Sequence, residues 1–176
     1  MDKEAKSNKM HDYQIVSISE EHIAGFRSAV DFVAREQKYL AFLEAPSLES
    51  TTAFVLNNIK QNYPQFVVIN NGSVVGWCDV IPNNSRIIHS HCGTLGIGLL
   101  PEFRGKGIGR KLMVEAIHAS FGIGLTRIEL AVRKTNANAI ALYKSLGFEI
   151  EGLHRCAVRI EGQYEDQYSM ALLRIQ

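Results

Sequence analysis

The sequence lacks the features that mark several large classes of protein. It has no apolar run long enough to span a bilayer, and its polar start, MDKEAKSNKMHDYQ, lacks the apolar core of a signal peptide. Its three cysteines are odd in number and scattered, which argues against a disulfide framework. We therefore expect a cytoplasmic protein with reduced thiols and no membrane partner.

The chain also lacks an excess of charge of either sign. It has 19 Lys and Arg against 18 Asp and Glu, a net charge of +1, whereas a dedicated nucleic-acid binder would be broadly basic. We therefore expect no nucleic-acid partner. With 176 residues and no internal repeat, low-complexity tract or linker, we expect a lead-in at 1–11 and a single domain at 12–176.

The hydrophobic pattern predicts a mixture of strands and helices. Helices are expected at 19–37, 48–62, 108–121 and within 136–148, the last ending at Gly147. Strands are expected at 13–18, 65–70, 73–81, 94–100, 126–132, 149–160 and 163–173. Asn71-Gly72 is typical of a type I′ hairpin turn. The resulting order predicts an α/β (α+β) fold, with a mostly antiparallel sheet of about seven strands flanked by about four helices.

The segment PEFRGKGIGRKL (101–112) carries the strongest local signal. It contains alternating glycines and a concentration of cations: Arg104, Gly105, Lys106, Gly107, Gly109, Arg110 and Lys111. Such glycines let the backbone approach an anion, and the following helix adds free N–H groups and its positive dipole end. The sequence thus predicts a phosphate site, the alternative being a tight turn between a strand and a helix.

Two well-known phosphate motifs do not fit this segment. The P-loop pattern G-x-x-x-x-G-K-[ST] and the dinucleotide pattern G-x-G-x-x-G, each started at Gly105, both require a glycine at position 110. That position holds Arg110. A nucleotide-binding regulatory domain therefore fails on spacing.

A family becomes recognisable in two motifs. The run from Arg104 to Gly109 resembles the Q/R-x-x-G-x-G/A signature of the GNAT acyl-CoA N-acyltransferases. Downstream, a second set resembles the family's N-x-N-x-x-A/I-x-x-L-Y-x-x-x-G-F pattern: Asn136, Asn138, Ala139, Leu142, Tyr143, Gly147 and Phe148. The resemblance covers roughly 65–175 well and 13–64 loosely. It implies a GNAT-like fold, with acetyl-CoA as co-substrate and no metal.

The resemblance also implies which residues hold the co-substrate. The amides of 105–110 would bind the pyrophosphate, and Gly98 to Leu100 would pair with the pantetheine arm like an added strand. An amide near Leu99 would point at the thioester carbonyl as an oxyanion donor. The expected binding residues are Leu99, Leu100, Arg104, Gly105, Lys106, Gly107, Ile108, Gly109, Arg110 and Asn136.

Tyr143 is the candidate acid that protonates the departing thiolate. A phenol with a pKa near ~10 can protonate a thiolate whose pKa, judged by cysteine, is roughly 8.5. Asn136 and Tyr143 lie seven residues apart, on nearly the same helix face, so both could face the co-substrate. The alternative is an ordinary core aromatic.

The base that neutralises the amine has two candidates, Glu129 and His91. Glu129 lies between Ile128 and Leu130 in a strand, so it points away from both, towards a helix, a cleft or solvent. It is a base or a solvated, ion-paired residue. His91 could act directly or through water, or be a hydrogen-bonded surface histidine. His89 and His91 share a strand face, but no supporting ligand cluster follows, so we expect no metal.

The acceptor is expected under the segment KYLAFLEAPSLES, which roofs the amine site in the resembling enzymes. Glu36 or Glu44 could hold a cationic amine there, and residues near the last hairpin could line the pocket or a dimer contact: Tyr164, Asp166 and Tyr168. The C-terminal pattern is similar to that of GNAT members acting on small amines. We therefore expect an N-acetyltransferase for a primary amine, most simply of a small molecule. A protein N-terminal or lysine acetyltransferase, a non-catalytic CoA-binding sensor and a homodimer remain open.

Overall fold

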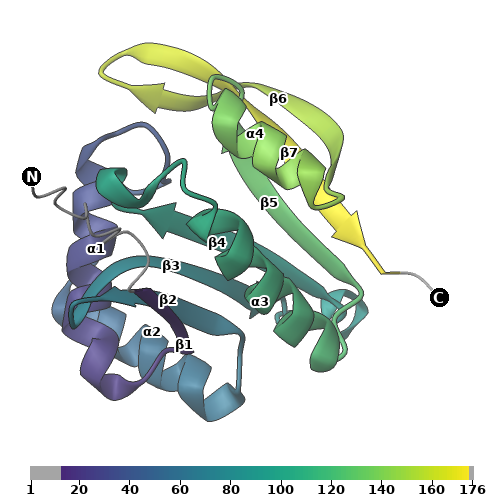
Figure 1. Ribbon diagram of the computed structural model, residues 1–176. Helices are drawn as coiled ribbons and strands as arrows, with labels where there is room; N and C mark the ends of the chain where they lie inside the picture. Colours follow the sequence, from purple (N-terminus) through teal and green to yellow (C-terminus); the bar gives the residue numbers. More distant parts are fainter. Residues whose placement is uncertain (1–12, 175–176) are drawn as a thin grey trace, which may run out of the picture.

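The protein is built on one seven-stranded sheet (Figure 1). The computed structural model describes residues 13–174, and the expected lead-in at 1–11 lies outside them. The strands follow the order β1-β2-β3-β4-β5-β7-β6. Their bounds are β1 Tyr13–Ser17, β2 Gln65–Asn70, β3 Ser73–Pro82, β4 Cys92–Leu99, β5 Arg127–Arg133, β6 Glu149–Ile160 and β7 Gln163–Leu173. Neighbours are antiparallel except β4 and β5, so the predicted fold class is confirmed.

Four α-helices flank the sheet, close to their predicted positions. They are α1 Ile23–Arg35, α2 Leu48–Gln61, α3 Ile108–Gly122 and α4 Ala137–Ser145. A short 3-10 turn, Glu20–His22, replaces the predicted start of the first helix. The Ser47 hydroxyl caps α2 by accepting a hydrogen bond from the Ser50 amide at 3.1 Å. None of the described helices has the length and apolar character needed to cross a bilayer.

The predicted hairpin turns form as their sequences require. Asn71 and Gly72 have φ angles of 49° and 77°, the left-handed pair of a type I′ turn. Glu161 and Gly162 repeat this geometry, with 48° and 82°, at the tip of the β6–β7 hairpin. Because this turn matches the twist of paired strands, it sets the register of both hairpins.

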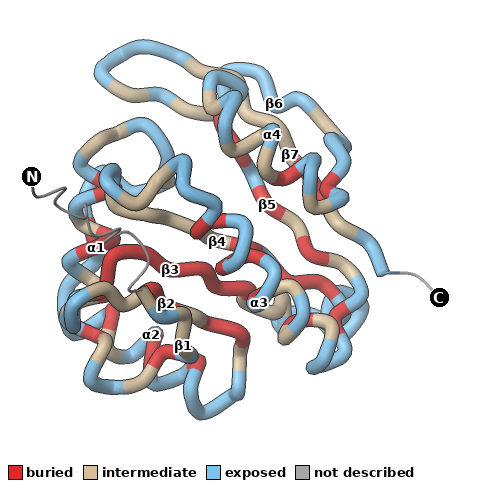
Figure 2. The backbone as a smooth tube through the Cα atoms, in the orientation of Figure 1, coloured by how far each residue is buried: buried red, intermediate tan, exposed pale blue. Residues whose placement is uncertain are grey.

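The sheet separates two hydrophobic cores, one for each pair of helices (Figures 1 and 2). On one face, α1 and α2 pack on β2 and β3 through residues such as Phe26, Val55, Val67 and Trp77. On the other face α3 and α4 pack on the central strands through Leu112, Met113, Tyr143, Ile128 and Met170. Alternation within β3 sends Trp77 to the first core and Cys78 to the second, as a strand covered on both faces requires.

The sheet opens between β4 and β5. Their parallel pairing comprises only Cys92 with Arg127, Gly93 with Ile128 and Thr94 with Glu129. Beyond Thr94, β4 continues to Leu99 alongside β3, while β5 continues to Arg133 alongside β7. This divergence of two central strands positions the site described below.

The packing of α3 gives a stability prediction. Leu112 is fully buried against the sheet, whereas Val114 on the same helix is 47% exposed. We expect Leu112→Ala to lower the free energy of unfolding by about 2–5 kcal/mol, because it removes buried methyl groups and leaves a cavity. Val114→Ala, the control, should change it by about 0.5 kcal/mol or less. Urea unfolding measures both, and equal effects would contradict this placement of the core.

Candidate active site

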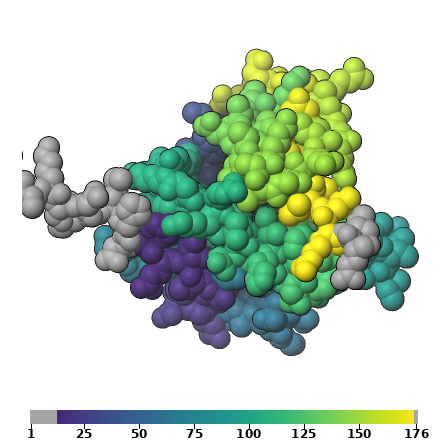
Figure 3. Space-filling view, turned by 45° about the vertical axis from the view of Figure 1, so that its right-hand side comes forward, coloured from purple at the N-terminus to yellow at the C-terminus, as the bar shows by residue number. Residues whose placement is uncertain are grey.

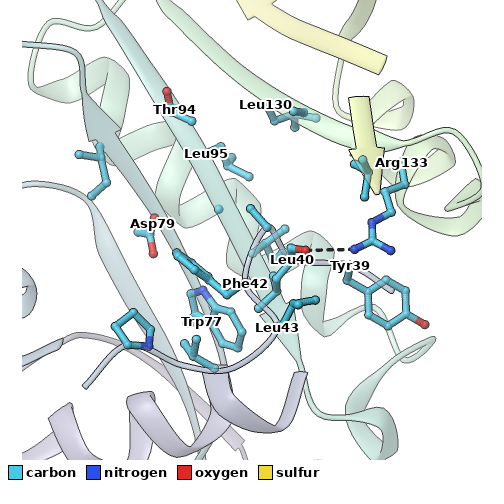
Figure 4. Close-up of a pocket in the computed structure, with 18 of the residues that line it drawn as sticks. Tyr39, Leu40, Phe42, Leu43, Trp77, Asp79, Thr94, Leu95, Leu130 and Arg133 are labelled. Carbon is cyan, nitrogen blue, oxygen red and sulfur yellow. Dashed lines mark hydrogen bonds between the residues drawn. The ribbon is translucent and has the colours of Figure 1, made fainter. Parts of the chain in front are cut away.

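A cleft of about 890 Å³ lies where β4 and β5 diverge (Figure 4). Its walls come from β3, β4, β5, β6 and β7, from α1, α2 and α4, and from the segment 36–47 that links α1 to α2. Most of the lining is apolar, including Phe26, Val30, Phe42, Trp77 and Ile160. This size and character are those of a small-molecule site.

The predicted phosphate loop follows β4 and ends at the start of α3. Gly105 and Gly107 have φ angles of 69° and 78°, and a Cβ atom at either position would meet no other atom within 4 Å. The glycines are therefore required by backbone conformation rather than by crowding. No side chain among the described residues caps the N-terminus of α3, so its first-turn amides are left for an anion. The loop fits the expected pyrophosphate cradle.

The cations and apolar residues of this loop have different environments. Lys106 and Lys111 lie near the rings of Phe103 and Tyr13, and the Arg110 guanidinium donates to the Ser145 hydroxyl at 2.7 Å. Ile108 and Gly109 are buried beneath the helix start. In the space-filling view, α3 (teal) lies at the surface beside α4 (light green) (Figure 3). The cationic side chains are thus held by weak contacts near the surface.

Arg104 differs, because its side chain turns inward. Its guanidinium forms a two-pronged ion pair with Glu36, with Nη1 donating to Oε1 at 2.9 Å, and its Nε donates to the Leu99 carbonyl at 2.7 Å. It also lies 4.7 Å from the centre of the Tyr39 ring. The Arg104 charge therefore ties the loop to the end of α1, which competes with the phosphate contact expected of this side chain.

The end of β4 presents a backbone donor to the gap. The Leu100 amide donates to the Val75 carbonyl of β3 at 2.9 Å. Because successive residues of a strand direct their amides to opposite sides, the Leu99 amide points away from β3, toward the space left by β5. This is the orientation required of the predicted oxyanion donor and strand partner.

Tyr143 lines the cleft from α4 and is 8% exposed. Within residues 13–174 its hydroxyl makes no hydrogen bond. Burial raises the pKa of this phenol well above its ordinary value, so the hydroxyl stays protonated in the cleft. Asn136 does not reach across to it: its side chain caps α4 by accepting from the Ala139 amide at 3.3 Å.

Glu129 and His91 lie where β4 and β5 are still paired, outside the residues that line the cleft. The Glu129 carboxylate accepts from Arg127 Nε at 3.1 Å, and the same guanidinium binds Glu151. His91 Nε2 lies 3.4 Å from the Cys92 sulfur. The structure thus places both candidate bases outside the lining that includes Tyr143.

The segment 36–47 covers the cleft, as the resemblance implied. Side chains from β5 and α1 form hydrogen bonds to its backbone. Arg133 Nη1 donates to the Gln37 carbonyl at 2.6 Å, and Nη2 donates to the Leu40 carbonyl at 3.2 Å (Figure 4). Arg27 binds the Pro46 carbonyl, and Asp31 accepts from the Ala45 amide. The predicted amine-binding carboxylates are occupied elsewhere, Glu36 by Arg104 and Glu44 by Arg35.

The last hairpin reaches the cleft through residues other than the predicted ones. The lining residues are Ala157, Val158, Arg159 and Ile160 from β6 and Gln167 from β7. Tyr164 instead lies beside Arg159 on the surface, and Tyr168 packs against the core. Asp166 accepts from the Cys156 amide and pairs with Lys134.

Sequence reasoning missed Asp79. This residue lies on β3, opposite Gly96 of β4, and is 9% exposed at the wall of the cleft (Figure 4). Burial raises its pKa to about 7. The available signal was a single carboxylate within the apolar run VVGWCDVI.

The comparisons with known proteins agree with this geometry. The family model described as "Acetyltransferase (GNAT) family" matches residues 20–148. The L-amino acid N-acetyltransferase AaaT of Escherichia coli K12 is 36% identical over 111 residues, 62% of this chain and 68% of that protein. The ribosomal protein bS18-alanine N-acetyltransferase of the same strain is 30% identical over 137 residues, 78% of this chain and 85% of that protein.

Solved structures show the same fold. The structure of yncA from Salmonella typhimurium with its cofactor acetyl-CoA has a TM-score of 0.86 at 20% identity, covering 93% of this chain and 94% of that one. The family model matches more than half of the chain, and the divergence of β4 from β5 next to a glycine-rich helix start agrees with it. The chain therefore belongs to the GNAT family and is an acetyl-CoA-dependent N-acetyltransferase.

Proposed function

We propose that the protein moves the acetyl group of acetyl-CoA to the primary amine of a small molecule with an apolar body. The observation that carries this proposal is the cleft between β4 and β5, which is mostly apolar and of small-molecule size. It lies next to the glycine loop, so donor and acceptor would meet where the strands part.

The charges of the cleft favour an acceptor with one amine rather than several. Among the described residues that line it, Asp79 is the one carboxylate, while Arg133 and Arg159 are cations. A polyamine carries several ammonium groups, and each would need an acidic partner or solvent. A monoamine or an amino acid with an apolar side chain suits this lining better.

The co-substrate would be held mainly by backbone. The amides of 105–110 would bind the pyrophosphate, with Lys106 and Arg110 adding charge at the surface. The residues from Gly98 to Leu100 would pair with the pantetheine arm, and the Leu99 amide would donate to the thioester oxygen. That donor would stabilise the negative oxygen of the tetrahedral intermediate formed by direct attack of the amine.

Tyr143 is the proposed acid. It lines the cleft, its hydroxyl has no partner among residues 13–174, and its raised pKa keeps it in the protonated form that an acid requires. Proton transfer to the sulfur then completes cleavage of the C–S bond.

A protein N-terminus is the second candidate acceptor. One relative is named for acetylating an alanine of ribosomal protein bS18, and it shares 30% identity over 78% of this chain. An α-amine of a peptide would present the same reacting group to the cleft. An assay that offers both kinds of acceptor separates these two candidates, because a peptide and a free amino acid share the α-amine but differ in the rest of the molecule.

The first prediction concerns the acceptor. Free-thiol release from acetyl-CoA is measured with apolar amino acids, aromatic monoamines, phosphinothricin-like compounds, spermidine and short peptides. We expect the highest kcat/KM with a monoamine or amino acid that has an apolar body, because the lining is mainly apolar. A higher kcat/KM with a peptide would contradict the small-molecule acceptor and favour a protein N-terminus. Acetyl-CoA binding without release on any amine would favour a CoA sensor.

The second prediction concerns the phosphate loop. Gly107→Glu should abolish acetyl-CoA binding by calorimetry, since it adds bulk, a negative charge and strain at a φ of 78°. Gly162→Glu is the matched control, because Gly162 has a φ of 82° and equally open surroundings at the hairpin tip. It should bind normally. Undiminished affinity in Gly107→Glu would remove the loop from the co-substrate site.

The third prediction concerns Tyr143. Tyr143→Phe should keep acetyl-CoA affinity but lower kcat by about 100-fold or more, the scale of general acid catalysis. The control, Tyr63→Phe, removes a hydroxyl that accepts from Asn84 outside the cleft and should leave kcat unchanged. An unchanged kcat in Tyr143→Phe would show that its hydroxyl does not supply the proton in the slow step.

A further inference from the structure

Asp79 is a buried carboxylate that the fold leaves without a partner. It is 9% exposed, and within residues 13–174 its side chain makes neither an ion pair nor a hydrogen bond. Two side-chain atoms of the described residues are both fully enclosed and without a hydrogen-bond partner, Asn58 Oδ1 and Gln65 Nε2. The carboxylate oxygens of Asp79 do not belong to this group, so they are not sealed inside the protein. Since Asp79 also lines the cleft, its oxygens face open space there rather than the core.

The residue paired with Asp79 on β4, and one that lines the cleft from β5, are small. Gly96 is paired directly with Asp79, and a Cβ atom at Gly96 would lie 3.2 Å from Asp79 Oδ1. Ala131 lines the same cleft from β5, two residues beyond Glu129. Gly96 therefore gives the Asp79 carboxylate the room that a side chain on β4 would take, and the carboxylate lies at the wall of the cleft, where an amine can approach it.

The cleft offers no competing base. Its described lining contains no histidine, no lysine and no second carboxylate. Glu129 is paired with Arg127, and His91 lies beside Cys92, both outside the lining. Glu36 and Glu44 are paired with arginines. Acceptance of a proton inside the cleft thus falls to one side chain.

We propose that Asp79 is the general base, and that it first holds the acceptor as an ammonium ion and then takes its proton. The inference rests on the proposed function, because it requires an amine to be acetylated in this cleft. It also names a chemical class of acceptor, a primary amine that is protonated at neutral pH. Such an ammonium ion would form with the Asp79 carboxylate the ion pair that no residue within 13–174 forms.

The proton balance of the reaction assigns each group a role. Asp79 takes one proton from the ammonium and later releases it to solvent, and the neutral nitrogen forms the new N–C bond. When the C–S bond breaks, Tyr143 gives its proton to the thiolate. The nitrogen of the adduct returns a proton to the Tyr143 oxygen, leaving an amide, a free thiol and one proton in solution.

The titration of Asp79 suits this role. Burial is the cause of its raised pKa, about 7, which is near working pH, where a general base is most effective. The other titratable groups on the cleft are Tyr39 on the roof, Arg133 on β5, Tyr143 on α4 and Arg159 on β6, with Cys78 adjacent in β3. None of them is a cause of the shift, so it follows from desolvation.

The experiment compares pH profiles of Asp79→Asn and the wild type with the best acceptor of the panel. For the wild type we expect kcat/KM to rise with pH through about 7, as Asp79 ionises. Asp79→Asn should lose this rise and be slower by about 100-fold or more at pH 7. The deficit should shrink as pH approaches the pKa of the amine, because the amine then loses its proton without help.

Two controls separate a lost base from a damaged fold. Acetyl-CoA affinity of Asp79→Asn should equal that of the wild type. The midpoint of thermal unfolding of Asp79→Asn should lie above that of the wild type, and this difference should be larger at pH 8 than at pH 5. Between the ordinary pKa and about 7, the folded wild type binds more protons than the unfolded chain, so its stability falls as pH rises. Glu115→Gln, an exposed change on α3, should leave the pH profile unaltered.

Three results would overturn the inference. One is a wild-type profile without a rise near pH 7. Another is a deficit in Asp79→Asn that stays constant at every pH. The third is loss of the rise in Glu129→Gln with its retention in Asp79→Asn. Failure of the proposed function would differ, because then the wild type itself would acetylate no amine while still binding acetyl-CoA.

Discussion

The parting of β4 from β5 after Thr94 is the constraint on which the site depends. Each strand can leave the other because its opposite edge stays paired, β4 with β3 as far as Leu99 and β5 with β7 as far as Arg133. The inner edges then carry backbone groups that need partners, since unpaired buried amides and carbonyls are costly. An extended ligand arm inserted between the strands satisfies them as an added strand would.

Two arginines join the parts of the molecule that would hold donor and acceptor. Arg104 comes from the glycine loop, and its ion pair with Glu36 fixes that loop to the end of α1. Arg133 comes from the end of β5, and it donates hydrogen bonds to the Gln37 and Leu40 carbonyls of the segment 36–47, which covers the cleft. Both guanidiniums are partly or largely shielded from water, which strengthens such contacts relative to exposed pairs. The segment 36–47 is thereby positioned relative to both β4 and β5.

Local signals in the sequence predicted the fold well, but the composition of the cleft was beyond them. Asn71-Gly72 and the glycines of the loop act through their own backbone and could be interpreted alone. Strand alternation gave the face of Glu129 correctly, opposite to buried Ile128 and Leu130. It could not show that β5 stays paired with β4 as far as Glu129, which leaves Glu129 outside the residues that line the cleft. The ion pair of Arg104 was likewise beyond local signals, because Glu36 lies 68 residues away in the sequence.

Asp79 shows why such a residue escapes sequence analysis and why a protein would retain it. In a covered strand an acidic residue normally signals an ion pair, and the sequence offers no way to see that its partner is missing. An unpaired buried carboxylate destabilises the folded state wherever it is ionised. Replacing it with a neutral side chain would remove that penalty, so stability alone gives no reason to keep it. Conflicts of this kind between local stability and composition concentrate at functional sites. The unfavourable burial of the Asp79 carboxylate and the lack of a side chain at Gly96 beside it are both accounted for by the proposed amine, bound to that carboxylate in the cleft.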